Sequence, residues 1–402
     1  MKIIFCTTMF YDVEADIKVS KNPRPVSGHK FQSNVLDGLL QNNADISVIN
    51  IPRIRRFPDY KKVIVRKKKF TFQNKTVGIN IGFLNLYGLN YITQYFAVKR
   101  ELRKIIKSQN EGIVLMTFNT YIPQTFAILK AGKKSKIKTC NIIGDINGER
   151  YGLPIPFKGV KKALLELYTD IQFKKAQAFD CYVLHTEKMA EALHIQDKPH
   201  VLMECPLYYE KIATMNLAKS EEKLIFYAGA ISKEYGIDHL LNAFSFIKDS
   251  GYRLILAGKG TMDHKVEEYC KKNRRASFLG FVSPSVIAGY QSKASALVNP
   301  RTSKYNFVKY SFPSKNMESI ASGTPFVAHK LECIPREYDP YIIYPKSESD
   351  EDLAEALVNA CELTKEEKIR KGLAGNEFIV KYKNPRVLTE RILDLFDRVA
   401  GE

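Results

Sequence analysis

The segment SFPSKNMESIASGTPFVA, residues 311–328, holds the side chains best suited to chemistry. Lys315 and Glu318 lie three residues apart, so they share one face of a helix. The free amides and the dipole of a helix start favour an anion. A lysine, a carboxylate and free amides together therefore suit a ligand that carries both phosphate and hydroxyl groups. A nucleotide-sugar is such a ligand.

Capping residues predict the elements that position this pair. Pro313 suits the first turn of a helix, and the hydroxyls of Ser311 and Ser314 can cap the exposed amides there. Gly323 can adopt the left-handed conformation that ends a helix, and the proline two residues later prevents its continuation. The three apolar residues that follow are predicted to form a short parallel strand.

Further residues that could bind phosphate stand at predicted strand ends. Gly229 and Gly236 bracket a turn in which the backbone can approach phosphate oxygens, and Lys233 lies in the same turn. The alternative is a plain strand-to-helix turn. Arg301 follows the predicted strand 296–299, and a guanidinium there could contact phosphate with two hydrogen bonds. A surface salt bridge is the alternative for Arg301.

Two other motifs carry less chemistry. The acidic run Asp350-Glu351-Asp352 precedes an apolar helical pattern, so it is interpreted as a helix start that complements the dipole, and no catalytic metal is expected. Gly258-Lys259-Gly260 resembles half of a dinucleotide fingerprint, but Asp263 replaces the third glycine. NAD binding is therefore not predicted.

The positive charge of the chain is unevenly distributed. The net charge is +19, and residues 1–200 hold 33 Lys and Arg against 16 Asp and Glu. The basic excess concentrates in segments 53–69, 133–138 and 158–175, of which the last also has an apolar face. These segments are either a solvated basic face or a surface for anionic lipid headgroups or a phosphate-bearing substrate. Nucleic acid remains possible on charge alone, but no zinc-finger or RNA-recognition pattern accompanies it.

Both halves of the 402-residue chain alternate strand-like and helix-like segments, which predicts two α/β domains with parallel sheets. Residues 215–223 are polar and charged and are interpreted as a linker. A last helix, 387–399, follows a proline. The N-terminus is interpreted as a first strand rather than a signal peptide, and no segment is apolar enough to span a bilayer. The protein is expected to be soluble or peripheral to a membrane.

Together these features resemble the retaining glycosyltransferases of family 4, which have the two-domain GT-B fold. The resemblance runs through most of the chain and is densest from Leu224 to Ile342. Its carriers are FYAGAISKEYGIDHLLNAF (226–244), LILAGKG (254–260), FLGFVS (278–283), LVNPR (297–301) and residues 311–328. A weaker likeness in NIIGDINGERYGLP (141–154) and CYVLHTEKMAEAL (181–193) points to a branch acting in bacterial surface-polysaccharide assembly.

The resemblance implies a nucleotide-diphosphate-sugar bound mainly by the C-terminal domain, with no cofactor. Glu318 matches the second glutamate of the family's Glu–seven residues–Glu motif, whose role is to hold the ribose, whereas Tyr310 stands at the position of the first. The donor-binding residues expected here are Gly229, Lys233, Arg301, Ser314, Lys315 and Glu318.

This sequence departs from the family at two phosphate-binding positions. Ala230 replaces the usual arginine after the first glycine, and Tyr235 replaces the lysine before the second. We therefore expect Arg301, Lys315 and Lys233 to provide the missing positive charge.

In the N-terminal half, Gly28 and His29 fit the family's glycine loop that shapes the acceptor side. Asp145 ends a predicted strand, where the family often has a His or Asp facing the reacting sugar. A carboxylate there could steer or deprotonate an acceptor hydroxyl, or it could simply cap a helix or lie in a loop. Asp145 and Glu318 are the expected catalytic residues.

The resulting prediction is an α/β protein with two Rossmann-like domains facing a central cleft. Residues 1–207 would form the acceptor-side domain, with 386–402 packing on it, and 208–385 the donor domain. The predicted function is metal-independent hexose transfer to a lipid-linked or polysaccharide acceptor, in the cytoplasm at the inner membrane face, without nucleic acid. The alternatives are a nucleotide-sugar epimerase or phosphorylase, and a non-catalytic basic protein that binds membranes or nucleic acid.

Overall fold

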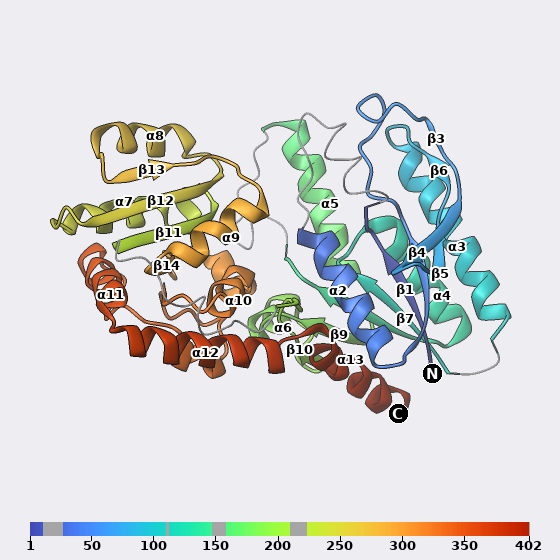
Figure 1. Cartoon of the computed structure of the whole chain (residues 1–402). Coiled ribbons are helices and arrows are strands. Elements are labelled where there is room, and N and C mark those ends of the chain that lie inside the picture. Colours follow the sequence, from blue (N-terminus) through green and yellow to red (C-terminus); the bar gives the residue numbers. More distant parts are fainter. Residues whose placement is uncertain (11–26, 110–111, 147–157, 210–222, 402) are drawn as a thin grey trace. The chain divides into compact units, whose positions relative to one another are not determined.

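A computed structural model describes residues 1–10, 27–109, 112–146, 158–209 and 223–401 of the chain. The contacts divide the chain into two compact units. The first comprises Met1–Leu207 together with Asn384–Glu402, and the second comprises Tyr208–Lys383. Each unit is built around its own sheet (Figure 1).

The sheet of the first unit has eight strands in the order β10-β9-β8-β7-β1-β2-β5-β4. Neighbouring strands run parallel, except that β4 pairs antiparallel with β5. The inner strands are almost wholly buried, as expected of a parallel sheet covered on both faces. The bounds are β1 Lys2–Thr7, β2 Asp45–Asn50, β4 Lys68–Phe72, β5 Lys75–Asn80, β7 Ile113–Phe118, β8 Lys138–Ile143, β9 Cys181–Leu184 and β10 His200–Leu202.

The last helix of the chain belongs to this first unit. It packs against α2 (Figure 1). A Cβ added to Gly38 of α2 would collide with the carbonyl oxygen of Pro385. The predicted return of the C-terminal helix to the N-terminal domain is therefore confirmed. The helices of the unit are α2 Ser27–Gln41, α3 Leu89–Lys107, α4 Ile122–Ser135, α5 Val160–Ala176, α6 Glu187–Leu193 and α13 Pro385–Ala400.

The sheet of the second unit has five parallel strands in the order β13-β12-β11-β14-β15. Its first strand in the chain, β11, lies in the middle, with the second strand on one side and the fourth on the other. That order is the Rossmann arrangement, which confirms the predicted fold class. The bounds are β11 Lys223–Ala230, β12 Tyr252–Lys259, β13 Ala276–Phe278, β14 Ala296–Asn299 and β15 Phe326–Ala328.

Helices cover this sheet and close its core. The side chains of Leu240, Leu254 and Leu357 are fully buried within one hydrophobic cluster. The helices are α7 Ile237–Phe246, α8 Asp263–Lys272, α9 Pro284–Lys293, α10 Ser314–Ala321, α11 Asp350–Glu362 and α12 Lys365–Tyr382, with 3₁₀ turns η3 Lys233–Tyr235, η4 Asn306–Tyr310 and η5 Arg336–Tyr341.

Several elements were not predicted from the sequence. They include α4, α12 and a short antiparallel pair, β3 (Ile64–Val65) with β6 (Phe83–Leu84). A capping box between Thr364 and Glu367 begins α12 and was the signal that could have found it. Of the predicted linker, 215–222 lies outside the described residues, and Lys223 already belongs to β11.

Candidate functional site

The topology of the second unit singles out one edge of its sheet. Chain order reverses between β11 and β14, which pair in parallel. Ligands of open α/β sheets bind outside the carboxyl ends of the strands at such a reversal. The residues that follow β11 and β14 include Lys233, Gly236 and Arg301, which are predicted to bind phosphate. The fold of this unit therefore brings these predicted residues to one edge.

The turn after β11 depends on its glycines. Gly236 has φ +81°, and a Cβ on it would collide with the carbonyl oxygen of Pro300. Gly229 lies at the end of β11, where a Cβ would lie 2.6 Å from the Tyr227 hydroxyl. Lys233 is exposed at the first position of η3. The backbone of this turn thus approaches the end of β14 as only glycine allows.

Arg301 is buried rather than exposed on the surface. Only 3% of it is exposed, and its Nη1 donates to the carbonyl oxygen of Ser311 at 3.4 Å. Its guanidinium carbon lies 5.6 Å from the ring centre of Tyr235 and 4.7 Å from that of Phe307. These aromatic rings fix a positive charge beside the turn that contains Gly236.

Helix α10 contains Lys315 and Glu318, the pair predicted to bind phosphate and hydroxyl groups. Lys315 Nζ donates to Glu318 Oε2 at 2.6 Å, so the two side chains share one face, as their spacing predicts. Ser314 is the first residue of the helix. The predicted capping is wrong in detail: Pro313 is the N-cap rather than a first-turn residue, and within the described residues no side chain caps the helix. The first amides of α10 are thus not held by a capping side chain.

Asn316, between these two residues, was missed by the sequence analysis. It is fully buried, and its Oδ1 accepts from Asn299 Nδ2 at 2.7 Å. Its own Nδ2 has no hydrogen-bond partner among the described residues. This contact ties the start of α10 to the end of β14. It therefore connects the Lys315–Glu318 pair with the strand end that Arg301 follows.

In the first unit, Gly28 and His29 lie in the first turn of α2. The Nδ1 of His29 accepts from the Phe10 amide at 3.2 Å. Burial and the nearby Arg53 guanidinium lower the pKa of His29, so its imidazole is neutral at pH 7. A Cβ on Gly28 would lie 3.2 Å from Arg53 Nη1, so the glycine leaves room for that guanidinium.

Asp145 lies two residues after β8 and is exposed. His185, which follows β9 directly, was not singled out from the sequence although it ends a strand at the same sheet edge. Its Nδ1 lies 2.7 Å from the Met203 carbonyl oxygen. Burial lowers the pKa of its imidazole, whereas this hydrogen bond and the Asp145 carboxylate act in the opposite direction. The Asp145 carboxylate thus lies close enough to His185 to oppose the lowering of its pKa.

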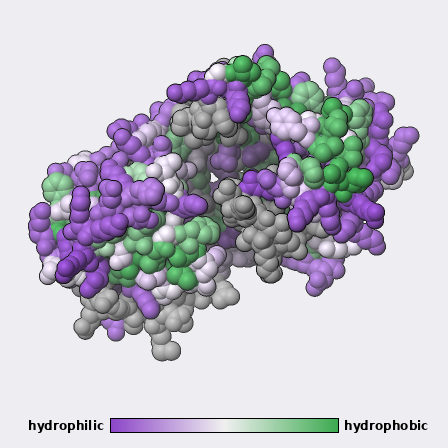
Figure 2. Space-filling view, turned by 90° about the horizontal axis from the view of Figure 1, so that it is seen from above, coloured by the Kyte–Doolittle hydropathy of each residue, from purple (hydrophilic) through white to green (hydrophobic). Residues whose placement is uncertain are grey.

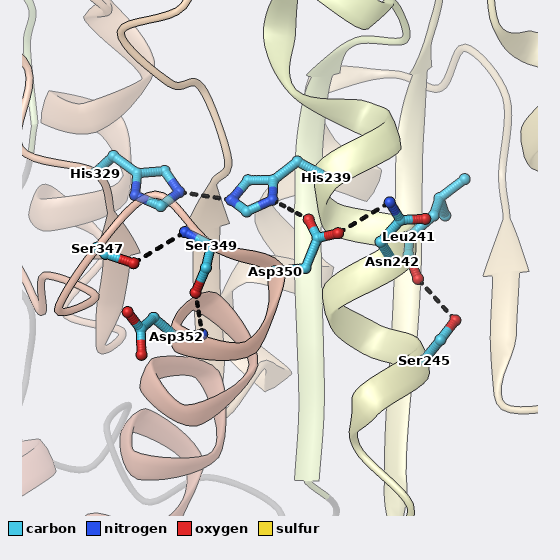
Figure 3. A network of polar contacts seen from close by, with 9 residues as sticks. All are labelled: His239, Leu241, Asn242, Ser245, His329, Ser347, Ser349, Asp350 and Asp352. Atoms are coloured by element: carbon cyan, nitrogen blue, oxygen red, sulfur yellow. Dashed lines mark hydrogen bonds and ion pairs between the residues drawn. The ribbon is translucent and has the colours of Figure 1, made fainter.

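A polar network in the second unit links three elements (Figure 3). His239 of α7 contacts Asp350 at the start of α11 through Nδ1, and its Nε2 lies 2.8 Å from His329 Nε2, after β15. Asn242 donates to the second oxygen of Asp350 at 3.0 Å. The Ser349 hydroxyl accepts from the Asp352 amide, which confirms that this acidic run starts a helix.

This network predicts acid-sensitive stability. Burial, followed by repulsion from His239, lowers the pKa of His329 from 6.5 to about 4, against a smaller opposing effect of Glu348. Because the folded state prefers the neutral imidazole, its contribution is complete above pH 6.5 and is lost as the pH falls towards 4. We expect this one group to lower the free energy of unfolding by about 2 kcal/mol over that interval.

Urea unfolding of the wild type and of His329→Gln at pH 4 to 7 tests this expectation. The variant cannot titrate at this position, so the difference in unfolding free energy between the two proteins should change across the interval. A difference that stays constant with pH would contradict the prediction.

Comparisons with known proteins bear on the second unit most directly. Residues 222–363 match the family "Glycosyl transferases group 1". The match covers about a third of the chain and lies within the second unit. The segment includes the glycine turn, Arg301 and α10 described above.

Two curated relatives are similar to this chain over shorter stretches. An uncharacterized glycosyltransferase of Methanocaldococcus jannaschii is 27% identical over 137 residues, 32% of this chain and 34% of the relative. The alpha-monoglucosyldiacylglycerol synthase of Streptococcus pneumoniae is 29% identical over 113 residues, 27% of this chain and 24% of the relative. The chain thus spans about a third of the length of one relative and a quarter of the other.

Solved structures resemble the whole chain in fold. Sucrose-phosphate synthase from Thermosynechococcus elongatus has a TM-score of 0.66 at 14% identity, covering 100% of both chains. HepE of Anabaena in complex with UDP has a TM-score of 0.60 at 12% identity, covering 99% of this chain and 100% of the other. The chain therefore has the GT-B fold, which has two Rossmann-like sheets.

Two further features of the described residues concern membranes and metals. No helix within them is long and apolar enough to cross a membrane. No group of three or more His, Cys, Asp or Glu side chains among them could hold a metal ion.

Proposed function

We propose that the protein is a retaining, metal-independent glycosyltransferase that transfers a hexose from a nucleotide-diphosphate-sugar. Its acceptor is a lipid-linked or polysaccharide glycan in cell-surface glycan assembly. In this proposal residues 208–385 bind the donor, whereas residues 1–207 with 386–402 bind the acceptor. The group 1 match of the second unit supports the donor assignment.

The observation that carries the proposal is the start of α10. In the part of the chain that the structure describes, its amides have no capping side chain, and the ammonium of Lys315 lies beside the carboxylate of Glu318. The amides and Lys315 would bind the diphosphate, and Glu318 would accept hydrogen bonds from the ribose hydroxyls. When the glycosidic bond breaks, the same positive groups would stabilise the charge on the departing phosphate.

Arg301 would replace basic groups that the family usually provides. The positions of those groups hold Ala230 and Tyr235, and the Tyr235 ring contacts the Arg301 guanidinium. Tyr235 thus supports the guanidinium of Arg301, which follows β14, the strand beside β11 in the sheet. Lys233 in the same turn would add a second positive charge, and the glycine backbone at Gly229 would lie near the phosphates.

In the first unit, Asp145 would orient or deprotonate the acceptor hydroxyl, with Gly28 and His29 shaping the acceptor side. The exposed carboxylate and the neighbouring His185 support this role. Asp145 then acts as an acceptor-side acid–base group, and Glu318 acts on the donor.

We also place the enzyme at the cytoplasmic membrane surface. Helix α5 exposes Val160, Leu164 and Leu167 by 77%, 62% and 58%, and their spacing puts them on one face. Lys158 and Lys161 beside them are exposed. Figure 2 shows that apolar patches interrupt the hydrophilic surface of the protein. Apolar side chains flanked by lysines suit an anionic lipid surface.

Vesicle binding tests this placement. The triple variant V160S/L164S/L167S is expected to bind phosphatidylglycerol vesicles at least ~10-fold more weakly than the wild type, because each lost apolar side chain removes about 1 kcal/mol or more of burial in the interface. The control is Phe281→Ser, which removes a side chain that is 79% exposed in the second unit. Equal binding by the triple variant and the control would contradict the role of α5.

Product analysis with labelled nucleotide-sugars tests the reaction itself. With a glycan-lipid acceptor, the enzyme should release nucleoside diphosphate and form a product that keeps the anomeric configuration of the donor. Conversion of the donor to another nucleotide-sugar without an acceptor would identify an epimerase instead. Release of sugar 1-phosphate by inorganic phosphate would identify a phosphorylase.

A further inference from the structure

The first unit contains a cavity of about 450 Å³. It lies beyond the carboxyl ends of β1, β2, β7 and β8, where Thr8, Arg53, Asn119 and Asp145 contribute to its wall. Chain order reverses at β1, because β2 lies on one side of it and β7 on the other. This position and a volume within roughly 300 to 1,000 Å³ are typical of small-molecule sites in α/β sheets.

The charge of the cavity wall is positive. Two arginines, Arg53 and Arg56, line it, whereas Asp145 is the only carboxylate among the lining residues that the structure describes. Both arginines come from the segment that follows β2, within the basic stretch 53–69 that the sequence offers as a surface for lipid headgroups or a phosphate-bearing substrate. An excess of guanidinium groups in a concave site favours an anionic ligand.

Arg56 is held in place by aromatic groups rather than by an acid. Its Nη2 donates to the Tyr91 hydroxyl at 3.0 Å, and its guanidinium carbon lies 4.9 Å from the ring centre of Tyr87. Within the described part of the chain it forms no ion pair. Its charge is therefore positioned without being neutralised by a carboxylate there, and a guanidinium so placed can contact phosphate oxygens.

The rest of the wall suits a sugar. Asn90 is only 5% exposed, and its Oδ1 has no hydrogen-bond partner among the described residues. The Tyr121 hydroxyl, also in the wall, donates to Gln94 Oε1 at 2.7 Å. The rings of Phe118 and Phe173 also line the cavity and offer apolar surface beside these amide and hydroxyl groups. A buried acceptor without a partner costs about 1 to 3 kcal/mol, which a ligand hydroxyl would recover.

We propose that this cavity binds a sugar that carries a phosphate group, with Arg56 on the phosphate and Asn90 on a sugar hydroxyl. The inference rests on the proposed transferase function in one respect, namely that this sugar phosphate is the acceptor. The exposed carboxylate of Asp145 in the same wall would then face a hydroxyl of the bound acceptor.

Binding to the full-length protein without nucleotide tests the cavity independently of the donor site. Ligand-observed NMR and calorimetry are run with glucose 1-phosphate, with glucose, with inorganic phosphate, and with a glucosyl phosphate that bears a short alkyl chain. Glucose 1-phosphate should bind, and glucose and inorganic phosphate should each bind roughly 10-fold or more weakly. Tighter binding of the alkyl form would identify a lipid-linked acceptor, and equal binding a soluble one.

Two variants and a control complete the test. Arg56→Gln should weaken the binding of glucose 1-phosphate by roughly 10- to 100-fold, and Asn90→Ala should weaken it as well. Arg66→Gln should not, because Arg66 is exposed and does not line the cavity. Melting temperatures show whether the variants fold.

The inference fails if glucose binds as tightly as glucose 1-phosphate, if neither binds, or if Arg56→Gln binds like Arg66→Gln. A nucleoside diphosphate that still stabilises the protein in such a case would leave the donor assignment intact. The failure of the cavity and the failure of the proposed function are thus distinguishable.

Discussion

Replacing Lys315 by alanine is expected to lower kcat/KM for sugar transfer by roughly 100- to 1,000-fold. The ammonium lies at the uncapped start of α10, where it would oppose the charge that develops on the departing diphosphate. The fold should survive, because Lys315 is exposed and its ion pair with Glu318 contributes at most about 1 kcal/mol to stability. Steady-state kinetics and a melting curve measure both effects.

Companion variants separate this role from a general loss of charge. Lys272→Ala removes an exposed lysine of α8 in the same unit and should retain activity. Glu318→Gln keeps the shape of the side chain but weakens its contact with ribose, so we expect KM for the donor to rise more than kcat falls. Full activity in both Lys315→Ala and Glu318→Ala would show that α10 does not bind the donor.

Replacing Gly236 by alanine is expected to destabilise the second unit by about 3 kcal/mol or more and to abolish donor binding. The residue has φ +81°, and its new Cβ would collide with the Pro300 carbonyl oxygen, so the turn would have to move away from the end of β14. Arg301 follows Pro300 directly, so its guanidinium would shift as well. Urea unfolding and nucleotide titration measure the two losses.

Gly280→Ala is the matched control for this variant. Gly280 also has a positive φ, +65°, but no atom lies within 4 Å of its added Cβ. It should cost only the conformational penalty of about 1 to 2 kcal/mol and leave donor binding unchanged. Equal destabilisation by the two substitutions would show that the approach to Pro300 contributes nothing.

The parallel sheets, and the placement of Lys315 and Glu318 on one face of a helix, were predictable from the sequence because their signals are local. Buried apolar runs predict strands, and a three-residue spacing places two side chains on one helix face. The return of α13 was predicted from the family resemblance, and its buried packing on α2 is what stabilises it there.

The missed features depend on contacts between residues far apart in the chain. Arg301 was weighed against a surface salt bridge, yet it is buried against Tyr235, 66 positions earlier. The contact between His239 and His329 joins residues 90 apart, and no local spacing indicates it. The cavity that includes Arg56 and Asn90 likewise exists only because several strand ends meet at one edge of the sheet.

The central claim is that the second unit binds the nucleotide diphosphate of a sugar donor at the start of α10. Calorimetric titration of the wild type, Lys315→Ala and Lys272→Ala with UDP, GDP and ADP tests it most directly. One of the three nucleotides should bind the wild type and Lys272→Ala and raise their melting temperatures, since a ligand bound only to the native state stabilises it by about 2.7 kcal/mol at 100 times its Kd. Lys315→Ala should bind that nucleotide at least ~10-fold more weakly. Absence of binding by all three nucleotides, or equal affinity in the two variants, would contradict the claim.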